Sequence, residues 1–370
     1  MITKKYRLAI LTDFLAFQGG IEKSILLLAQ ELQKRGHQVT IYAGLYDKKS
    51  TFKEFTAFTI KPFLTKKLPE GIHGLYLRNK FRRLKLKGHD GTIIFGFHTI
   101  AAGKYNHPNV WWSTRPLPYL YGLWGAGPDT KTLQQAPFYK RVAMKTYFAH
   151  LLKKDKQDIQ SIDTMYSVGV LAQKAVENAY APRKAPVLVQ PINLVQYHTS
   201  PQKGTYYLNI ARQVSDKNVD RVIQAFKAMP EKKLIQVGAG EQQAKMHALA
   251  AGAKNIIFKG FVEEEELPSI VAGSIAMISA SEDEDYSMNL IESIASGKPT
   301  ISTNLDRTIK GIVQTPTGLL LPNSQPATLK QAVKLLTPKK ALKMQKACLA
   351  RSKQFSAKQF ADALLQALSL

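Results

Sequence analysis

The 370-residue sequence contains one cysteine, Cys348, and no long apolar run. A single cysteine excludes an intrachain disulfide and a zinc site built on several cysteines, and it suits a reducing compartment. Every apolar run is shorter than the about 18–20 residues that span a bilayer. Thr12 and Asp13 interrupt the N-terminal apolar stretch, and no small-residue cleavage site follows, so we interpret it as a buried strand, not a signal peptide. We therefore expect a cytoplasmic protein.

Acidic residues are scarce: 27 Asp and Glu stand against 52 Lys and Arg, which gives a formal net charge of +25. Hydrophobic residues make up 45% of the chain, an ordinary share for a globular protein, so a disordered chain is excluded. A charge this positive indicates an anionic partner. Nucleic acid, anionic lipid headgroups and a phosphorylated substrate all remain open on charge alone.

Apolar periodicity predicts alternating strands and helices in both halves of the chain. A strand at 6–11, a turn at Gly19-Gly20, a helix at 21–35 and a strand at 39–43 form a βαβ unit, which implies a parallel sheet. After a Pro- and Gly-containing segment at 186–205, alternation resumes from 206 to 302. We expect an α/β protein with two Rossmann-like, doubly wound domains, at 1–190 and 191–350, that face a cleft. A C-terminal helix at 351–370 is expected to pack back on the first domain.

Two basic stretches with interleaved apolar residues lie in the N-terminal half, at 61–87 and 140–156. The first contains nine Lys and Arg residues and the single acid Glu70. Such stretches are typical of surfaces that bind anionic membranes, because the cations attract headgroups and the apolar side chains enter the interface. A solvated surface that only aids solubility is the alternative.

Glu284 and Glu292 lie eight residues apart around a predicted helix start near Ser287 or Met288. The start of a helix offers unpaired N–H groups and the positive end of the helix dipole, which together attract anions. Two nearby carboxylates could accept hydrogen bonds from sugar hydroxyls. This combination suits a nucleotide-sugar, with an acidic loop that caps a surface helix as the alternative.

The segment 284–299 resembles the signature of the GT-B retaining glycosyltransferases of family 4. Further elements of that family follow the expected order: Arg212 to Lys217, a strand that ends at Gly238-x-Gly240, Gly260-Phe261, and Thr317-Gly318. In the N-terminal half, Gly19-Gly20 and the Arg35-Gly36-His37 strand entry resemble the family more loosely. The resemblance implies the GT-B fold, with an N-terminal acceptor-binding domain and a C-terminal nucleotide-sugar-binding domain.

The resemblance also implies residue roles. Arg212 and Lys217 would hold the donor diphosphate and, with Glu284, act in catalysis; two cations there neutralise charge on the leaving group. Glu284 would hold hydroxyls of the transferred sugar and Glu292 those of the ribose, while Gly19 and Gly20 would let backbone approach the phosphates. The full set expected at the donor is Gly19, Gly20, Arg212, Lys217, Gly238, Gly260, Phe261, Glu284, Tyr286, Ser287, Met288 and Glu292.

Two positions depart from the family pattern. Tyr286-Ser287 replaces an aromatic-Gly pair, which narrows the room at the helix start. Thr114 stands at or near the place where many relatives carry a histidine that faces donor sugar and acceptor. His98 and Arg115 are the candidate substitutes, so His98, Thr114 and Arg115 are the acceptor-side candidates.

The sequence thus predicts a retaining glycosyltransferase that uses a UDP-, GDP- or ADP-sugar, with no cofactor and no metal. The acid-x-acid pattern at Glu282 to Glu284 is like a metal site, but it falls inside the two-glutamate signature. The expected acceptor is a lipid-linked or cell-envelope glycan. We expect the enzyme to be a peripheral protein on the inner face of the cell membrane. A nucleotide-sugar-binding protein without transferase activity and a nucleic-acid-binding protein are the alternatives; for the latter, charge is the only support.

Overall fold

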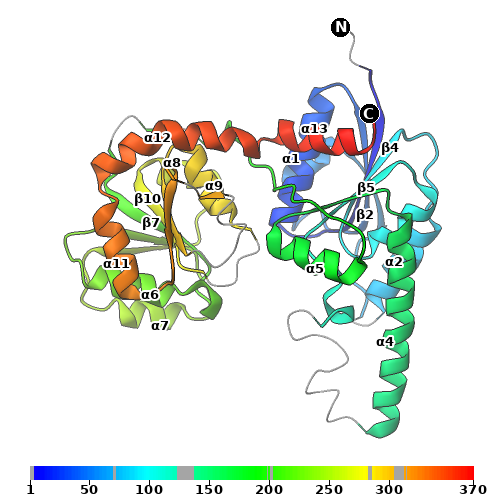
Figure 1. Cartoon of the computed structure of the whole chain (residues 1–370), viewed down its shortest axis with the longest axis horizontal. Helices are drawn as coiled ribbons and strands as arrows, with labels where there is room; N and C mark the ends of the chain where they lie inside the picture. The colour runs from blue at the N-terminus through cyan, green and yellow to red at the C-terminus, as the bar shows by residue number, and fades with distance from the viewer. Residues whose placement is uncertain are drawn as a thin grey trace. The chain divides into compact units, whose positions relative to one another are not determined.

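The computed structural model describes residues 4–69, 72–122, 137–197, 199–200, 203–281, 286–303, 312–313 and 315–370. The chain forms two compact units. Unit 1 comprises Met1–Pro191 and Ala357–Leu370, and unit 2 comprises Ile192–Ser356. Each unit is built on one six-stranded parallel sheet (Figure 1).

Unit 1 has the strand order β3-β2-β1-β4-β5-β6. Strands β2 and β3 are added on one side of the central β1, and β4 to β6 are added on the other, so the order of addition reverses between β3 and β4. The interior of β1, Leu8–Leu11, is fully buried, as expected for a parallel strand covered on both faces. The strands are β1 (Arg7–Leu15), β2 (Gln38–Tyr46), β3 (Thr59–Leu64), β4 (Gly91–Phe95), β5 (Asn109–Ser113) and β6 (Thr164–Ser167). The α-helices are α1 (Gly20–Lys34), α2 (His73–Arg83), α4 (Phe138–Asp158), α5 (Val170–Tyr180) and α13 (Ala357–Ala367).

Unit 2 repeats the arrangement, with the order β12-β11-β10-β7-β8-β9, so its first strand again lies beside its fourth. The strands are β7 (Tyr206–Ile210), β8 (Leu234–Val237), β9 (Ile256–Gly260), β10 (Ser274–Ser279), β11 (Thr300–Thr303) and β12 (Gly318–Leu321). The α-helices are α6 (Val219–Lys227), α7 (Gln243–Leu249), α8 (Leu267–Ala272), α9 (Met288–Ala295), α11 (Pro326–Leu335) and α12 (Pro338–Ser352). Two Rossmann-like α/β units are therefore confirmed.

The basic stretch 61–87 contains two elements that periodicity did not predict, the end of β3 and all of α2. In α2 the buried side chains include Leu77, Arg78 and Phe81, so one member of the buried stripe is a charged residue. A buried arginine breaks the apolar pattern on which sequence-based helix prediction depends. The helix therefore packs through an ion-pair network as well as through apolar contacts.

That network joins α2 to α4. Arg78 Nη2 lies 2.8 Å from Asp155 Oδ1 and 2.7 Å from Asp158 Oδ2. Tyr121 and Tyr180 each donate an Oη–H hydrogen bond of 2.8 Å to Asp155 Oδ2. Burial and the adjacent Asp155 charge raise the pKa of both tyrosines, so they stay protonated and act as donors. Asp155 is fully buried, and its bonds to Arg78, Tyr121 and Tyr180 fix the C-terminal half of α4 to the rest of unit 1.

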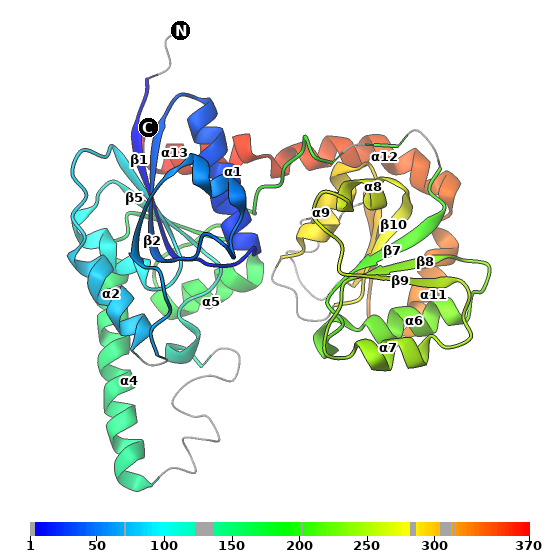
Figure 2. The same ribbon diagram turned by 180° about the vertical axis from the view of Figure 1, so that it is seen from behind.

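The C-terminal helix α13 packs on unit 1, beside α1 (Figure 2). Arg35 Nη1 lies 2.6 Å from Asp362 Oδ1, and the Arg35 guanidinium also donates to the Lys358 carbonyl. The rings of Trp112 and Phe360 meet edge to face at 5.7 Å. The chain thus returns to unit 1 after completing unit 2. No helix in the described ranges is both long enough and apolar enough to cross a bilayer.

We predict that Asp155→Ala lowers the free energy of unfolding of unit 1 by about 3–5 kcal/mol, because it leaves a buried guanidinium short of a partner. Urea unfolding followed by tryptophan fluorescence measures this, since all three tryptophans precede residue 191. Asp362→Ala, which breaks a partly exposed ion pair, is the matched control and should cost less than about 1 kcal/mol. Equal losses of stability in the two variants would contradict the role of the network.

Candidate active site

A pocket of about 280 Å³ lies in unit 2 at the carboxyl ends of β7 and β10. This is the edge of a doubly wound sheet at which ligands usually bind, next to the point where the strand order reverses. Its lining includes Asn209, Arg212, Lys217, Ser279, Ser281, Ser287 and Asn289. Three residues predicted for the donor, Arg212, Lys217 and Ser287, therefore line one pocket.

Asparagine side chains hold the pocket together. Asn289, in the first turn of α9, donates its Nδ2–H to the Ile210 carbonyl at 2.8 Å, which ties the helix start to the end of β7. Asn209 donates to the Ile278 carbonyl at 2.6 Å and so links β7 to β10. Asn218 adopts a left-handed conformation, with φ of 48°, and donates to the Ala280 carbonyl at 3.0 Å. These bonds fix the loop and the helix start on either side of the pocket.

Gly238 packs against the segment after β7 that lines the pocket. Its φ is +106°, and a Cβ there would lie 2.4 Å from the Ala211 carbonyl oxygen. Gln213 donates to the Gly238 carbonyl at 2.6 Å. Gly238 thus packs directly against the segment that carries Arg212, and it is not among the residues that line the pocket.

The pocket is built to receive negative charge. Arg212 is exposed, whereas the Lys217 side chain is 16% exposed, with Nζ 3.4 Å from Asp216 Oδ2. α9 begins at Met288 after Ser287, as the sequence predicted, so its unpaired N–H groups open on the same pocket. Two cations and a helix start suit a diphosphate.

Other residues predicted for the donor lie outside this pocket. Glu292, on α9, is 6% exposed. Burial of the Tyr197 and Tyr286 side chains raises their pKa, and the nearby negative charge of Glu292 raises it further. Phe261, after β9, is 76% exposed, and Gly260 has a φ of +66°. Glu284 lies outside the described residues, so its predicted role stays a prediction.

Unit 1 brings its predicted residues to one edge of its sheet. Gly19 and Gly20 follow β1, His98 follows β4, and Thr114 and Arg115 follow β5; β1, β4 and β5 are neighbours. The His98 ring is buried, which lowers its pKa. At the same edge the Asp13 carboxylate accepts backbone N–H bonds from residues 97–99.

Sequence reasoning missed Glu22, which lies in the first turn of α1. Its carboxyl is 2% exposed, and burial raises its pKa to about 7. A Cβ on Gly19 would lie 2.6 Å from Glu22 Oε2, so the glycine leaves room for this carboxyl. Glutamate at the start of a helix is ordinary, and no pattern in the sequence marks this one as buried.

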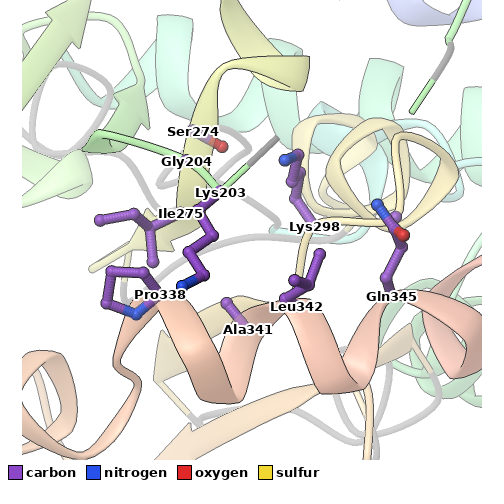
Figure 3. Close-up of a pocket in the computed structure, with 10 residues that line it drawn as sticks. Lys203, Gly204, Ser274, Ile275, Lys298, Pro338, Ala341, Leu342 and Gln345 are labelled. Atoms are coloured by element: carbon purple, nitrogen blue, oxygen red, sulfur yellow. The ribbon is translucent and has the colours of Figure 1, made fainter. Parts of the chain in front are cut away.

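A second hollow in unit 2 is lined by Ile275, Lys298, Ala341 and Leu342, among others (Figure 3). Its volume of about 10 Å³ is close to the least that holds one water molecule. It lies beside the starts of β7 and β10, at the opposite edge of the sheet from the pocket with Arg212. The hollow is therefore a packing gap between α12 and the sheet.

Comparison with known proteins relates unit 2 to a family. Residues 193–355 match the family model of the glycosyl transferases group 1. Over 128 residues the chain is 35% identical to D-rhamnosyltransferase WbpZ of Pseudomonas aeruginosa. That match covers 33% of this chain and 34% of WbpZ, so it spans about a third of the relative's length.

Solved structures extend the likeness to the whole fold. Anabaena HepE in complex with UDP and glucose matches with a TM-score of 0.70 at 12% identity, over 98% of this chain and 99% of HepE. The lipopolysaccharide outer core galactosyltransferase WaaB matches with a TM-score of 0.69 at 13% identity, over 98% and 99%. At such identities the likeness concerns the fold, which is GT-B.

We predict that Glu22→Gln removes a pH dependence of stability. The folded pKa of about 7 exceeds the unfolded value of 4.5, so the folded state retains a proton that the unfolded state releases. This contribution to stability is full below pH 4.5 and is lost as the pH rises to about 7. Above pH 7, Glu22→Gln should be more stable than the parent by up to about 3 kcal/mol.

The measurement is urea unfolding at several pH values, with the exposed Glu54→Gln as the matched control. The stability difference between Glu22→Gln and the parent should shrink towards pH 5. The stability difference between the control and the parent should not change with pH. A difference that stays constant from pH 5 to pH 8 would refute the buried, protonated state of Glu22.

Proposed function

We propose that the protein is a retaining glycosyltransferase that moves a sugar from a nucleoside-diphosphate sugar to an acceptor hydroxyl. The observation that carries this proposal is the unit 2 pocket, where Arg212, Lys217 and the start of α9 converge inside the segment that matches the glycosyl transferases group 1. Anabaena HepE, which shares the fold, has been solved in complex with UDP and glucose, and this supports a nucleotide-sugar donor. UDP-, GDP- and ADP-sugars are the candidate donors.

The proposed chemistry follows from charge. When the bond between the sugar C1 and the diphosphate oxygen breaks, negative charge develops on the leaving diphosphate. Arg212, Lys217 and the N–H groups of α9 would stabilise that charge, so the protein's own groups could do the work often given to a metal ion. The acceptor oxygen bonds to C1 on the same face, and its proton passes to the leaving phosphate; this front-face route is inferred from the family resemblance.

We predict that Arg212→Ala or Lys217→Ala lowers kcat/KM for transfer by about a hundredfold or more, because each removes a cation at the leaving group. The measurement is release of free nucleoside diphosphate from the donor that gives the largest rise in Tm among UDP-, GDP- and ADP-sugars. The control is Lys227→Ala, because Lys227 is the last residue of α6 and is not among the residues that line the pocket. Near-parental turnover in both pocket variants would overturn the diphosphate assignment, and donor binding without release would make this a binding protein.

We further propose that the acceptor is a lipid-linked or cell-envelope glycan at an anionic membrane surface, on the inner face of the cell membrane. The support lies in the N-terminal half of α4, which projects from the rest of unit 1 in both views (Figure 1 and Figure 2). Phe138, Tyr139 and Val142 are 73%, 68% and 47% exposed. Lys140 and Arg141 lie between them, and no acid occurs from 137 to 154.

This end of α4, residues 138–147, suits an anionic bilayer for two reasons. At about 100° per residue, its apolar residues other than Met144 fall on one half of the helix circumference, and its cations fall on the other half, which is the arrangement of a helix that lies at a membrane interface; the apolar half carries Phe138, Tyr139, Val142, Ala143 and Tyr147, and the cations are Lys140, Arg141 and Lys145. Its cations each contribute about 1 kcal/mol of attraction to an anionic surface. Insertion of the first turn would bury its aromatic side chains and leave the cations among the headgroups.

We predict that the triple variant Phe138→Ser, Tyr139→Ser, Val142→Ser binds phosphatidylglycerol vesicles about tenfold or more weakly than the parent. Co-sedimentation measures this, with phosphatidylcholine vesicles to isolate the charge dependence. The control replaces exposed apolar residues of unit 2, as Val195→Ser with Leu335→Ser, and should bind as the parent does. Equal and negligible binding of the parent to both kinds of vesicle would overturn membrane association.

A further inference from the structure

A second basic feature of unit 1 is a surface groove between the C-terminal ends of α2 and α4. The groove has a volume of about 630 Å³, and its charged lining residues are Arg82, Arg83, Lys104, Lys154 and Asp158. We infer that this basic groove binds a phosphorylated anion. The inference is independent of the proposed transferase activity, because it concerns none of the residues assigned to the donor or to the end of α4 that we propose meets a membrane.

The charges in the groove are unbalanced. Its one carboxylate, Asp158, is already bonded to two guanidinium groups, at 2.7 Å from both Arg78 Nη2 and Arg82 Nη2. In the described ranges, Arg83, Lys104 and Lys154 form no ion pair with any carboxylate. Like charges held around one hollow repel each other, and a bound anion relieves that repulsion.

The groove is also preorganised. Asp158 holds Arg82 through its Nε and Nη2 atoms, at 3.3 and 2.7 Å, and Asp158 itself is fixed by the buried Arg78. Arg82 is therefore held in place before any ligand arrives, while its Nη1 makes no hydrogen bond to the described residues. Donors that are already fixed lose less conformational entropy on binding, so they bind an anion more tightly than mobile surface side chains do.

The side chains that line the groove indicate which kind of ligand it binds. Guanidinium and ammonium groups bind phosphate oxygens strongly, and the neutral residues Asn79, Gln157 and Ser161 add hydrogen-bonding groups. The volume lies within the range of about 300–1,000 Å³ that is usual for small-ligand pockets. A diphosphate or a phosphate ester fits this chemistry, and the phosphate could belong to a soluble compound or to a lipid headgroup.

The test removes three cations and spares Arg82, which holds Asp158. The groove variant is Arg83→Gln, Lys104→Gln, Lys154→Gln, made in an Arg212→Ala, Lys217→Ala background so that the unit 2 pocket does not contribute. The charge-matched control, in the same background, is Lys339→Gln, Lys343→Gln, Lys346→Gln, at three exposed positions of α12. Thermal unfolding verifies that both variants are folded.

Two arms separate the sources of phosphate. Calorimetric titration with inorganic pyrophosphate tests a soluble ligand, and co-sedimentation with phosphatidylglycerol vesicles tests a headgroup. We expect the groove variant to bind at least about tenfold more weakly than the control in one arm, because removing one charge-assisted hydrogen bond weakens binding by about a factor of ten. Weaker binding of pyrophosphate assigns a soluble ligand, and weaker binding confined to vesicles assigns a headgroup. Equal binding of groove variant and control in both arms would overturn the inference.

Discussion

The structure depends on how buried side chains satisfy the backbone at the carboxyl ends of its parallel strands. In a parallel sheet these ends leave carbonyl and N–H groups without strand partners, and buried groups of this kind must be paired. In unit 2, Asn209, Asn218 and Asn289 pair the carbonyls of residues 278, 280 and 210. In unit 1, Asp13 pairs three successive N–H groups after β4. The loops that carry Arg212, Lys217 and His98 are therefore fixed by the same bonds that complete each sheet.

This constraint separates two kinds of charge in the molecule. Buried charges such as Arg78 and Asp155 are paired at 2.8 Å and serve the packing of α2 against α4. Among the residues that the structure describes, no cation forms an ion pair with Glu22, and burial raises the pKa of its carboxyl, which favours the neutral acid. The cations left in excess lie at the surface, where a formal charge of +25 has few acids to balance it. Solubility needs far less than this, so the places where cations converge carry information about partners.

Local patterns were predictable from the sequence, and contacts between distant residues were not. The start of α9 at Met288 was predictable because the helix signal lies within a few residues, and so was the alternation that gives two Rossmann-like units. α2 escaped prediction because a buried Arg78 interrupts its apolar stripe, and its partner Asp155 lies 77 residues away. Asn289 and Glu22 look like surface residues in the sequence, since only the folded chain brings Ile210 or the buried face of α1 to them.

The two anion-binding surfaces proposed for unit 1 lie at opposite ends of one helix, and their separation constrains how that helix meets a bilayer. Phe138 and Lys154 are 16 residues apart on α4, which at 1.5 Å per residue separates them by about 24 Å. If α4 meets the bilayer end-on, the basic groove stands well beyond the headgroup layer, and its phosphate must come from a soluble compound or an extended acceptor. If α4 lies flat, both surfaces touch headgroups together. The source of the phosphate in the groove therefore reports the orientation of α4, because a lipid headgroup can reach the groove only when the helix lies flat.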